Sequence, residues 1–366
     1  PVGGAGSDGT PWSEPDFGTS IQRITDVQIG GAITPAFSSS QTINPSGSLI
    51  VLYEQGVGHR AYDANTFASL GPIDIDSDDV YNFSWHPTDE SLLYFPNRGD
   101  GASNSLIELN VRTRVRRVAA TFDQCIEIGQ GFGFGSTANG TSFMGLLCEQ
   151  ANGDHWMSYN LVTGDTVIAA EVDTTSTAPW SASVDGSLYA AFTNTAIRVL
   201  GADLSPTAQD PIIAAADSVA VTVGGPNANP VAVVSLSNDS ISNGVAIGFD
   251  LITGERFSLL DDTNGFGVVS GAEMASTLSA GAVVVTTGTP NDGIGDPFDG
   301  EILLIRIGES PVVYRLGRHR LSQDLGFGSE WGTGSFLALD PLGRYVLFSS
   351  DFGGGTAINT FAISLD

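Results

Sequence analysis

The sequence predicts an all-β fold made of repeated antiparallel units, and three observations predict it. The 366 residues include 46 glycines and many Val, Thr, Ser and Ile residues, while almost no stretch has apolar residues at helical spacing for three turns. Short apolar runs alternate with turn residues along the chain. One pattern of a turn followed by an apolar strand recurs from one end of the chain to the other.

The clearest copies of this pattern read NPSGSLIVLYE from Asn44, HPTDESLLYFPN from His86, SVDGSLYAAFTN from Ser183 and DPLGRYVLFSS from Asp340. Weaker copies bring the number of turns to seven: Gly47, Glu90, Gly140, Gly186, Asn229, Gly281 and Gly343. Their spacing of roughly 40 to 60 residues is close to the length of a four-stranded propeller blade. The repeat therefore predicts a seven-bladed β-propeller of four-stranded antiparallel blades.

A second recurring element is a polar turn between two strands. It reads YDANTFASL from Tyr62, ELNVRTRVRRV from Glu108, YNLVTGDTVIA from Tyr159 and FDLITGERFSLL from Phe249. The Thr-Gly-Asp and Thr-Gly-Glu turns favour a hairpin, because glycine accepts the positive φ that such turns require. We expect this hairpin to join the third and fourth strands of a blade.

The two ends of the chain are expected to complete one blade together. The segment from Ser335 to Asp366 supplies only three strands, and an unpaired sheet edge invites association with other chains. Residues 20–29, SIQRITDVQI, are rich in β-formers, so we expect them to pair with the last strand and close the ring. Residues 20–366 are then a single propeller domain, and residues 1–19 are a tail or loop.

With its recurring turns of the SxDGxxLxF type, nearly the whole chain resembles seven-bladed propellers of the WD40-like and TolB-like kind. The segment HRLSQDLGFGSEWGTGSFLALDPLGRYVLFSSDFGG, from His319, is broadly similar to the final blade of secreted propellers that include polysaccharide lyases. In the oligogalacturonide lyases several His and a Gln surround one metal ion. In this segment, the resemblance implies such roles for His319 and Gln323.

The charge balance excludes two classes of partner. The chain has 41 acidic residues against 14 basic ones, all arginine, for a net charge of -27. Sequence-independent binding to nucleic acid or to anionic membranes needs a basic surface. There is also no run of about 18 apolar residues, so no membrane span is expected. We expect a monomer with an acidic, solvated surface.

The two cysteines, Cys125 and Cys148, have neither CxxC nor zinc-ligand spacing. An even pair favours one disulfide in an oxidising compartment, which means a secreted or periplasmic protein. Two buried free thiols are the alternative.

The predicted topology places the loops between second and third strands on the same face as the loops between blades. Residues 54–60 and 149–156 are two of these loops, and His86 falls in a turn on the opposite face. The predicted catalytic residues on the loop-bearing face are His59, His155, His319 and Arg320. The predicted ligand-binding residues are Arg60, Arg98, Trp156, Arg318, Trp331 and Phe352.

This combination of residue types favours carbohydrate chemistry. Aromatic rings stack on sugars, Arg binds uronate carboxylates in bidentate fashion, and His acts as general acid or base in β-elimination. The face therefore predicts a glycan-binding module, with a polysaccharide lyase as the alternative. Two alternatives remain open for His59, His155 and His319. They are unrelated loop residues, or they are ligands of one transition metal together with Asp154 or Glu330.

Two acidic loops are candidate calcium sites. Hard cations take several oxygen ligands from flexible loops. The candidate ligands are Asp74, Asp76, Asp78, Asp292, Asp296 and Asp299. Solvated acidic loops are the alternative.

Overall fold

The structure is a computed structural model of the chain. It describes residues 9–27, 31–35, 41–75, 83–97, 103–129, 143–169, 180–182, 188–192, 196–201, 203–213, 218–223, 229–235, 246–260, 274–276, 281–286, 300–308, 310–320, 336–352 and 357–365.

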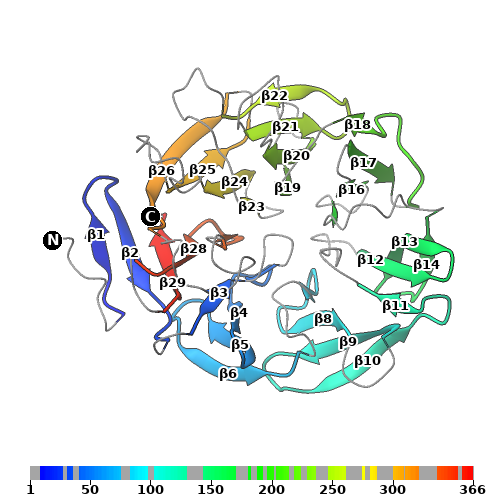
Figure 1. Cartoon of the computed structure of the whole chain (residues 1–366), viewed down its shortest axis with the longest axis horizontal. Helices are drawn as coiled ribbons and strands as arrows, with labels where there is room; N and C mark the ends of the chain where they lie inside the picture. The colour runs from blue at the N-terminus through cyan, green and yellow to red at the C-terminus, as the bar shows by residue number, and fades with distance from the viewer. Residues whose placement is uncertain are drawn as a thin grey trace.

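Within these ranges every regular element is a strand, and the strands form seven antiparallel sheets, six of four strands and one of five. Figure 1 shows the sheets arranged around a common centre, with β6, β10, β22 and β26 on the outside. This arrangement is a β-propeller, so the predicted all-β propeller class is confirmed. No helix in the described ranges is long and apolar enough to cross a membrane.

Sheets 1 to 3 each contain four consecutive strands. Sheet 1 consists of β3 (Ile33–Pro35), β4 (Leu49–Glu54), β5 (Gly58–Asp63) and β6 (Ser69–Ile73). Sheet 2 consists of β7 (Ser84–Trp85), β8 (Leu92–Pro96), β9 (Ser105–Asn110) and β10 (Arg116–Thr121). Sheet 3 consists of β11 (Glu127–Ile128), β12 (Phe143–Gln150), β13 (Gly153–Asn160) and β14 (Thr166–Ile168).

Sheets 4 to 6 repeat this order. Sheet 4 consists of β15 (Trp180–Ala182), β16 (Leu188–Phe192), β17 (Ala196–Gly201) and β18 (Ile212–Ile213). Sheet 5 consists of β19 (Ser218–Val223), β20 (Pro230–Ser235), β21 (Ala246–Asp250) and β22 (Arg256–Ser258). Sheet 6 consists of β23 (Met274–Ser276), β24 (Ala282–Thr286), β25 (Glu301–Arg306) and β26 (Val312–Arg318).

Sheet 7 combines the two ends of the chain. It consists of β27 (Ala338–Leu339), β28 (Tyr345–Ser350), β29 (Asn359–Ser364), β2 (Thr19–Arg23) and β1 (Trp12–Glu14). The predicted N-terminal segment does pair with the last strand, with Ile21 opposite Ile363. The sequence placed residues 12–14 in a tail, but they form the outermost strand, held by ring contacts of Trp12 with Phe352 and Phe361.

The core consists of apolar layers between neighbouring sheets. Alternate residues of β4 face opposite layers: Leu49 and Val51 pack toward sheet 2, while Ile50 and Leu52 pack toward sheet 7. All four side chains have no exposed surface. A strand covered on both faces needs a continuous apolar run, and LIVLY at residues 49–53 is such a run.

The polar turns between third and fourth strands share one geometry. In four sheets, the side-chain oxygen Oδ1 of the first turn residue accepts hydrogen bonds from the backbone N–H groups two and three residues later, at 2.8 to 3.1 Å. These first residues are Asp63, Asn110, Asn160 and Asp250. The turns join third and fourth strands, as predicted.

The fifth residue of each turn has a positive φ, and the sequence predicted glycine there in two cases. Gly164 and Gly254 have φ of 77° and 74°, which confirms that prediction. The equivalent residues of sheets 1 and 2 are Phe67 at 56° and Arg114 at 64°. A side chain in this conformation costs roughly 1 to 2 kcal/mol, so Phe67 is placed there at the expense of stability.

Arg344 joins sheet 7 to sheet 1. Its Nε donates to Asp340 Oδ2 at 2.7 Å, its Nη2 to the Gly47 carbonyl at 2.5 Å, and its Nη1 to Asn65 Oδ1 at 2.8 Å. The Asp340 side chain is fully buried. A buried carboxylate needs such a partner. The hydrogen bonds of Arg344 to Gly47 and Asn65 hold this turn of sheet 7 against two turns of sheet 1.

We predict that deleting residues 1–30 lowers the melting temperature and causes aggregation. The deletion removes Ile21, which is fully buried, and the loss of this side chain alone lowers the free energy of unfolding by about 2 to 5 kcal/mol. It also leaves the backbone edge of β29 unpaired. Circular dichroism and size-exclusion chromatography with light scattering measure both effects. Deletion of residues 1–8 is the control, because it spares β1 and β2. A protein lacking residues 1–30 that stays monomeric with an unchanged melting temperature contradicts the prediction.

Candidate functional site

The ends of β26 and β28 bring together two predicted site residues, Arg320 and Phe352. The guanidinium carbon of Arg320 lies 5.8 Å from the centre of the Phe352 ring, a cation–π distance. Arg320 Nη2 also donates to Glu14 Oε1 at 2.8 Å, and the Trp12 ring meets the Phe352 ring edge to face at 5.4 Å. We call Trp12, Glu14, Arg320 and Phe352 the rim cluster.

The rim cluster combines accessible rings with a neutralised ion pair. Trp12, Arg320 and Phe352 are half-buried, while Glu14 is only 4% exposed. Arg320 and Phe352 both have a positive φ, 49° and 51°. This backbone conformation is costly for residues other than glycine and persists only where the surrounding structure holds it. Such residues cluster at functional sites. The sequence missed Trp12 and Glu14, although WSE at residues 12–14 has the alternation of a short strand.

His319 and Arg318 lie beside this cluster, and of the two only His319 is buried. His319 is 3% exposed, and its backbone N–H donates to the Gly300 carbonyl at 2.9 Å. Arg318 Nη2 is 3.9 Å from Glu301 Oε1. Arg315 donates two hydrogen bonds to the same carboxylate, which is fully buried. Arg318 therefore lies at the edge of an existing ion pair.

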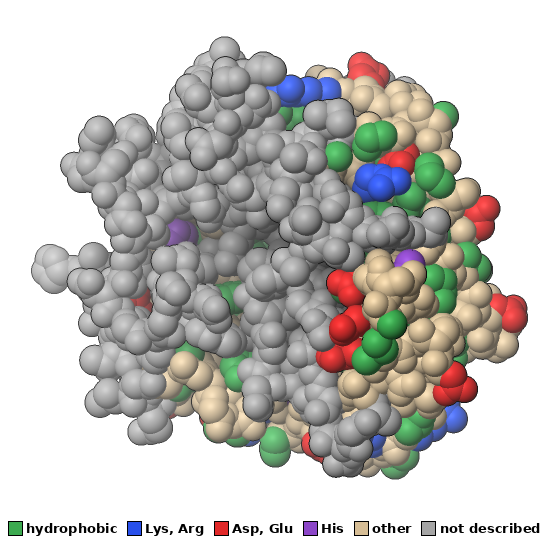
Figure 2. All heavy atoms as spheres, turned by 45° about the vertical axis from the view of Figure 1, so that its right-hand side comes forward, with side chains coloured by type: hydrophobic (Ala, Val, Ile, Leu, Met, Phe, Trp, Pro, Cys, Tyr) green, Lys and Arg blue, Asp and Glu red, His purple; other side chains and the backbone are tan. Residues whose placement is uncertain are grey.

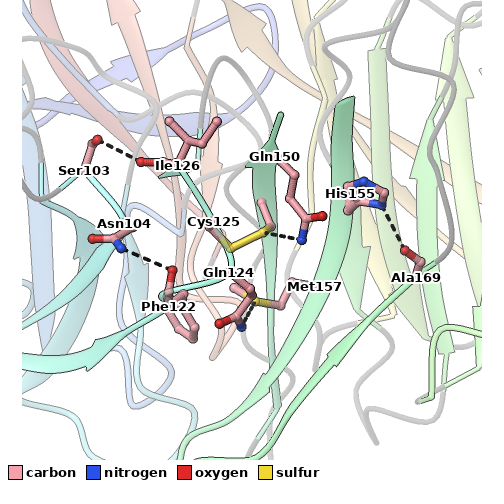
Figure 3. Close-up of a disulfide and its surroundings, with 11 residues drawn as sticks. Ser103, Asn104, Phe122, Gln124, Cys125, Ile126, Gln150, His155, Met157 and Ala169 are labelled. Carbon is pink, nitrogen blue, oxygen red and sulfur yellow. Dashed lines mark hydrogen bonds between the residues drawn. A yellow bond between two sulfur atoms is a disulfide. The ribbon is translucent and has the colours of Figure 1, made fainter. Parts of the chain in front are cut away.

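His155 and Trp156 belong to β13, next to the disulfide. Cys125 and Cys148 are bonded, which confirms the predicted bridge, and Cys148 lies opposite His155 in the β12–β13 pairing. Figure 3 shows the His155 ring turned toward Ala169, whose carbonyl oxygen is 3.2 Å from Nδ1. Nε2 has no hydrogen-bond partner among the described residues.

Trp156 is 6% exposed, and its ring lies 5.8 Å from the guanidinium carbon of Arg198. Arg198 is held by two hydrogen bonds of 2.7 Å to Asp210. The Trp156 ring therefore fills the space between sheets 3 and 4.

His59 lies in β5, buried among aromatic rings. It is 2% exposed, and its ring meets Tyr53 and Phe83 edge to face at 5.3 and 5.6 Å. Neither ring nitrogen has a hydrogen-bond partner among the described residues, and burial lowers the pKa of His59 from 6.5 to about 4. The adjacent Arg60 donates two hydrogen bonds to Glu54.

The positions of His59 and His155 correct one sequence prediction. Residues 54–60 and 149–156 were expected to be loops, but the connections between strands are only residues 55–57 and 151–152. Both histidines are therefore paired strand residues in different sheets. His86 lies in a turn, where its Nδ1 accepts hydrogen bonds from the backbone N–H groups of Thr88 and Asp89.

Several predicted residues lie outside the described ranges: Arg98, Trp331, Gln323, Glu330, Asp76, Asp78, Asp292, Asp296 and Asp299. Asp74 is described. Its carboxylate is 80% exposed and lies 3.3 Å from Arg116 Nη1.

The chain is similar in fold to solved propellers. An oligogalacturonate lyase from Vibrio parahaemolyticus has a TM-score of 0.64 at 15% identity, with 98% of this chain and 96% of that chain covered. An oligogalacturonate lyase in complex with manganese has a TM-score of 0.64 at 13% identity, with the same coverage. The structure of U3-55K has a TM-score of 0.58 at 11% identity, covering 97% and 100%. No family model and no curated protein matches the sequence. At identities this low, the TM-scores show that the fold is shared and nothing more.

The manganese complex raises the question of a metal centre in this chain. His59, His155 and His319 are all described, yet no three His, Cys, Asp or Glu residues of the described ranges are placed to hold a metal ion. Gly300 packs against His319, since a Cβ on this glycine would lie 3.4 Å from Nε2. The described residues do not fit a metal centre.

We predict that His59 makes the protein sensitive to acid. A histidine that is neutral when folded and has a normal pKa when unfolded stabilises the fold fully above pH 6.5, and this stability is lost as the pH falls toward 4. The shift corresponds to a loss of about 3 kcal/mol. Urea unfolding across this pH range is the measurement. His59→Leu should flatten the dependence, and an equally steep dependence in this variant contradicts the assignment.

We also predict that the disulfide contributes about 3 kcal/mol to the free energy of unfolding, because it closes a loop between residues separated by 23 positions. Urea unfolding of the Cys125→Ala, Cys148→Ala double variant measures this contribution. Reductant should shift the wild-type midpoint as far as the double variant and leave the variant unchanged. An unshifted wild-type midpoint with two free thiols contradicts the prediction.

Proposed function

We propose that this protein is a glycan-binding β-propeller whose rim cluster holds the sugar. The observation that carries the proposal is the half-exposed pair of rings, Trp12 and Phe352, beside the ion pair of Arg320 and Glu14. A sugar ring has an apolar face of C–H groups that packs on an aromatic ring, and hydroxyl groups around its edge. Arg320 is placed to donate to such hydroxyls.

The described arginines are mostly paired with carboxylates, and this pairing favours a neutral glycan over a polyuronate as the ligand. Within the described ranges, at least ten arginines form ion pairs with carboxylates, including Arg60, Arg318 and Arg320. Figure 2 shows Asp and Glu side chains along the right-hand side of the molecule. The chain as a whole carries a net charge of -27, so a polyanion meets net repulsion, and binding of uronate chains would need the rim arginine Arg320 to exchange its partner Glu14.

A polysaccharide lyase that acts by β-elimination is the second candidate. The shared fold with two oligogalacturonate lyases and the position of His319 next to Arg320 favour it. In this mechanism Arg320 holds a uronate carboxylate and His319 takes the proton from C5 beside it. The C4–C5 double bond forms as the C4–O glycosidic bond breaks, and the oxygen of the leaving sugar takes a proton from water. The burial of His319 requires local movement before it can reach a substrate.

The proposal also includes the finer architecture. We infer that the seven sheets are seven blades of one closed ring formed by residues 20–366, with the segment around Ile21 closing it, and that the protein is a monomer. The disulfide supports a secreted or periplasmic location. Calcium binding by the acidic loops stays a prediction, since five of its six aspartates lie outside the described ranges.

We predict that Phe352→Ala and Arg320→Gln each weaken glycan binding about tenfold or more, because each removes a direct contact. A glycan array selects the ligand, and calorimetric titration measures the affinity. Tyr314→Ala is the matched control, because Tyr314 is an exposed aromatic residue outside the rim cluster. A folded wild-type protein that binds no glycan on the array contradicts the proposal.

The same proteins separate the two candidates. Elimination creates a conjugated double bond, so a lyase raises the ultraviolet absorbance of uronate polymers. Binding without such a rise supports the binding module. A rise that is lost in Arg320→Gln supports the lyase and overturns the non-catalytic proposal.

A further inference from the structure

A second concave site lies between sheet 6 and sheet 7, away from the rim cluster. Its volume is about 430 Å³, within the range of small-molecule sites. Sheet 6 supplies Leu304, Arg306 and Tyr314 to its lining, and the opposite wall contains Leu339 and Leu365. We call this site the intersheet groove.

The intersheet groove and the rim cluster lie at opposite ends of β26. Tyr314 is near the start of this strand and lines the groove, while Arg320 follows the end of the strand. The strand has 7 residues, which span roughly 20 Å when extended. A small ligand in the groove therefore does not touch the rim cluster.

The groove continues the apolar layer between the two sheets to the surface. Deep in this layer, Val284 and Ile302 have no exposed surface. Leu304 and Leu365 pack against the same layer but are only partly buried. Tyr314 is 42% exposed and lies opposite Leu304 in the β25–β26 pairing, so both side chains are on one face of sheet 6. The groove therefore has an apolar floor that a ligand can reach.

Two equivalent glycines show that this seam is open where the next seam is closed. Gly47 and Gly343 occupy the same position of the repeated turn, with φ of 65° and 69°. A Cβ on Gly47 would lie 2.7 Å from Arg344 Nη2 and 2.8 Å from Asp340 Oδ1, because sheet 7 fills that space. A Cβ on Gly343, which lines the groove, would meet no described atom within 4 Å.

Arg306 gives the groove a positive charge. The residue is exposed, and it is the one charged residue among the described lining residues. Many arginines of the chain are paired with carboxylates, but Arg306 has no ion pair or hydrogen bond to any described residue. Its side chain projects from the same face of β25 as Leu304, two residues earlier, so the charge lies at the edge of the apolar floor. A guanidinium can bind a carboxylate through two parallel hydrogen bonds.

The acidic composition of the chain is compatible with a small anion at this place. No described lining residue of the groove is acidic. Repulsion by more distant exposed carboxylates is screened over about 8 Å at physiological salt, so direct contact with Arg306 decides how a single carboxylate binds. A polyanion would extend beyond the groove and meet the net charge of the whole chain.

We propose that the intersheet groove binds a small monocarboxylate with an apolar body, of the class of aliphatic acids. The carboxylate pairs with Arg306, and the hydrocarbon chain packs on Leu304, Leu365 and the Tyr314 ring. Burial of the hydrocarbon supplies most of the affinity, because an ion pair open to water contributes little. The pairing with Arg306 selects the acid over an uncharged molecule of the same shape.

The test uses the full chain and three probes at millimolar concentration: octanoate, octanol and acetate. Octanol has the hydrocarbon chain without the charge, and acetate has the charge without the chain. Saturation-transfer NMR detects binding, and titration gives the affinity. We expect octanoate to bind about fivefold more tightly than octanol, and more than tenfold more tightly than acetate.

Two variants assign the binding to the groove. Arg306→Gln should lower the affinity for octanoate to that for octanol and leave the affinity for octanol unchanged. Its melting temperature should not fall, because the side chain has no ion pair or hydrogen bond to a described residue. Arg256→Gln is the matched control, since Arg256 is an exposed arginine outside the groove. Tyr314→Ala should weaken octanoate and octanol alike, and it serves if Arg306→Gln does not fold.

Phe352→Ala separates this proposal from the proposed function, because it changes the rim cluster and leaves the intersheet groove intact. Octanoate binding that persists in Phe352→Ala and is weakened in Tyr314→Ala assigns the acid to the groove, whether or not a glycan binds the rim cluster. Three results overturn the proposal: octanoate does not bind the wild-type protein, octanol binds it as tightly as octanoate, or octanoate binds Arg306→Gln with wild-type affinity.

Discussion

The packing of each sheet face to face against the next is the interaction on which the rest of the structure depends. A strand such as β4 or β28 has apolar side chains on both faces, so it is stable only when a sheet covers each side. Sheet 7 consequently packs against both sheet 6 and sheet 1. The rim cluster lies at sheet 7, where the two ends of the chain meet.

Much of the fold could be predicted from the sequence because turns and strands have local causes. Asp63, Asn110, Asn160 and Asp250 make the same hydrogen bonds with their own neighbours, so the repeat is visible in the residues themselves. The pairing of β2 with β29 was also predictable, because the C-terminal unit has only three strands and the N-terminal segment can supply the fourth.

The candidate site was harder to predict because its chemistry depends on contacts between distant residues. Arg320 and Phe352 were predicted from residue type, but Glu14 and Trp12 lie some three hundred residues away in the chain. His59 and His155 were misplaced for a local reason: the tight connections before them leave both histidines inside paired strands. Residue type alone could not show that aromatic neighbours bury His59.

The position of β2 has a consequence for the order of events when the chain is made. Ile21 leaves the ribosome more than three hundred residues before its partner Ile363. The hairpin of β1 and β2 must wait until β29 has been made before its apolar face is covered, and contacts of such long sequence separation slow folding. A nascent chain of this design is exposed to mispairing for the whole interval between the synthesis of β2 and that of β29.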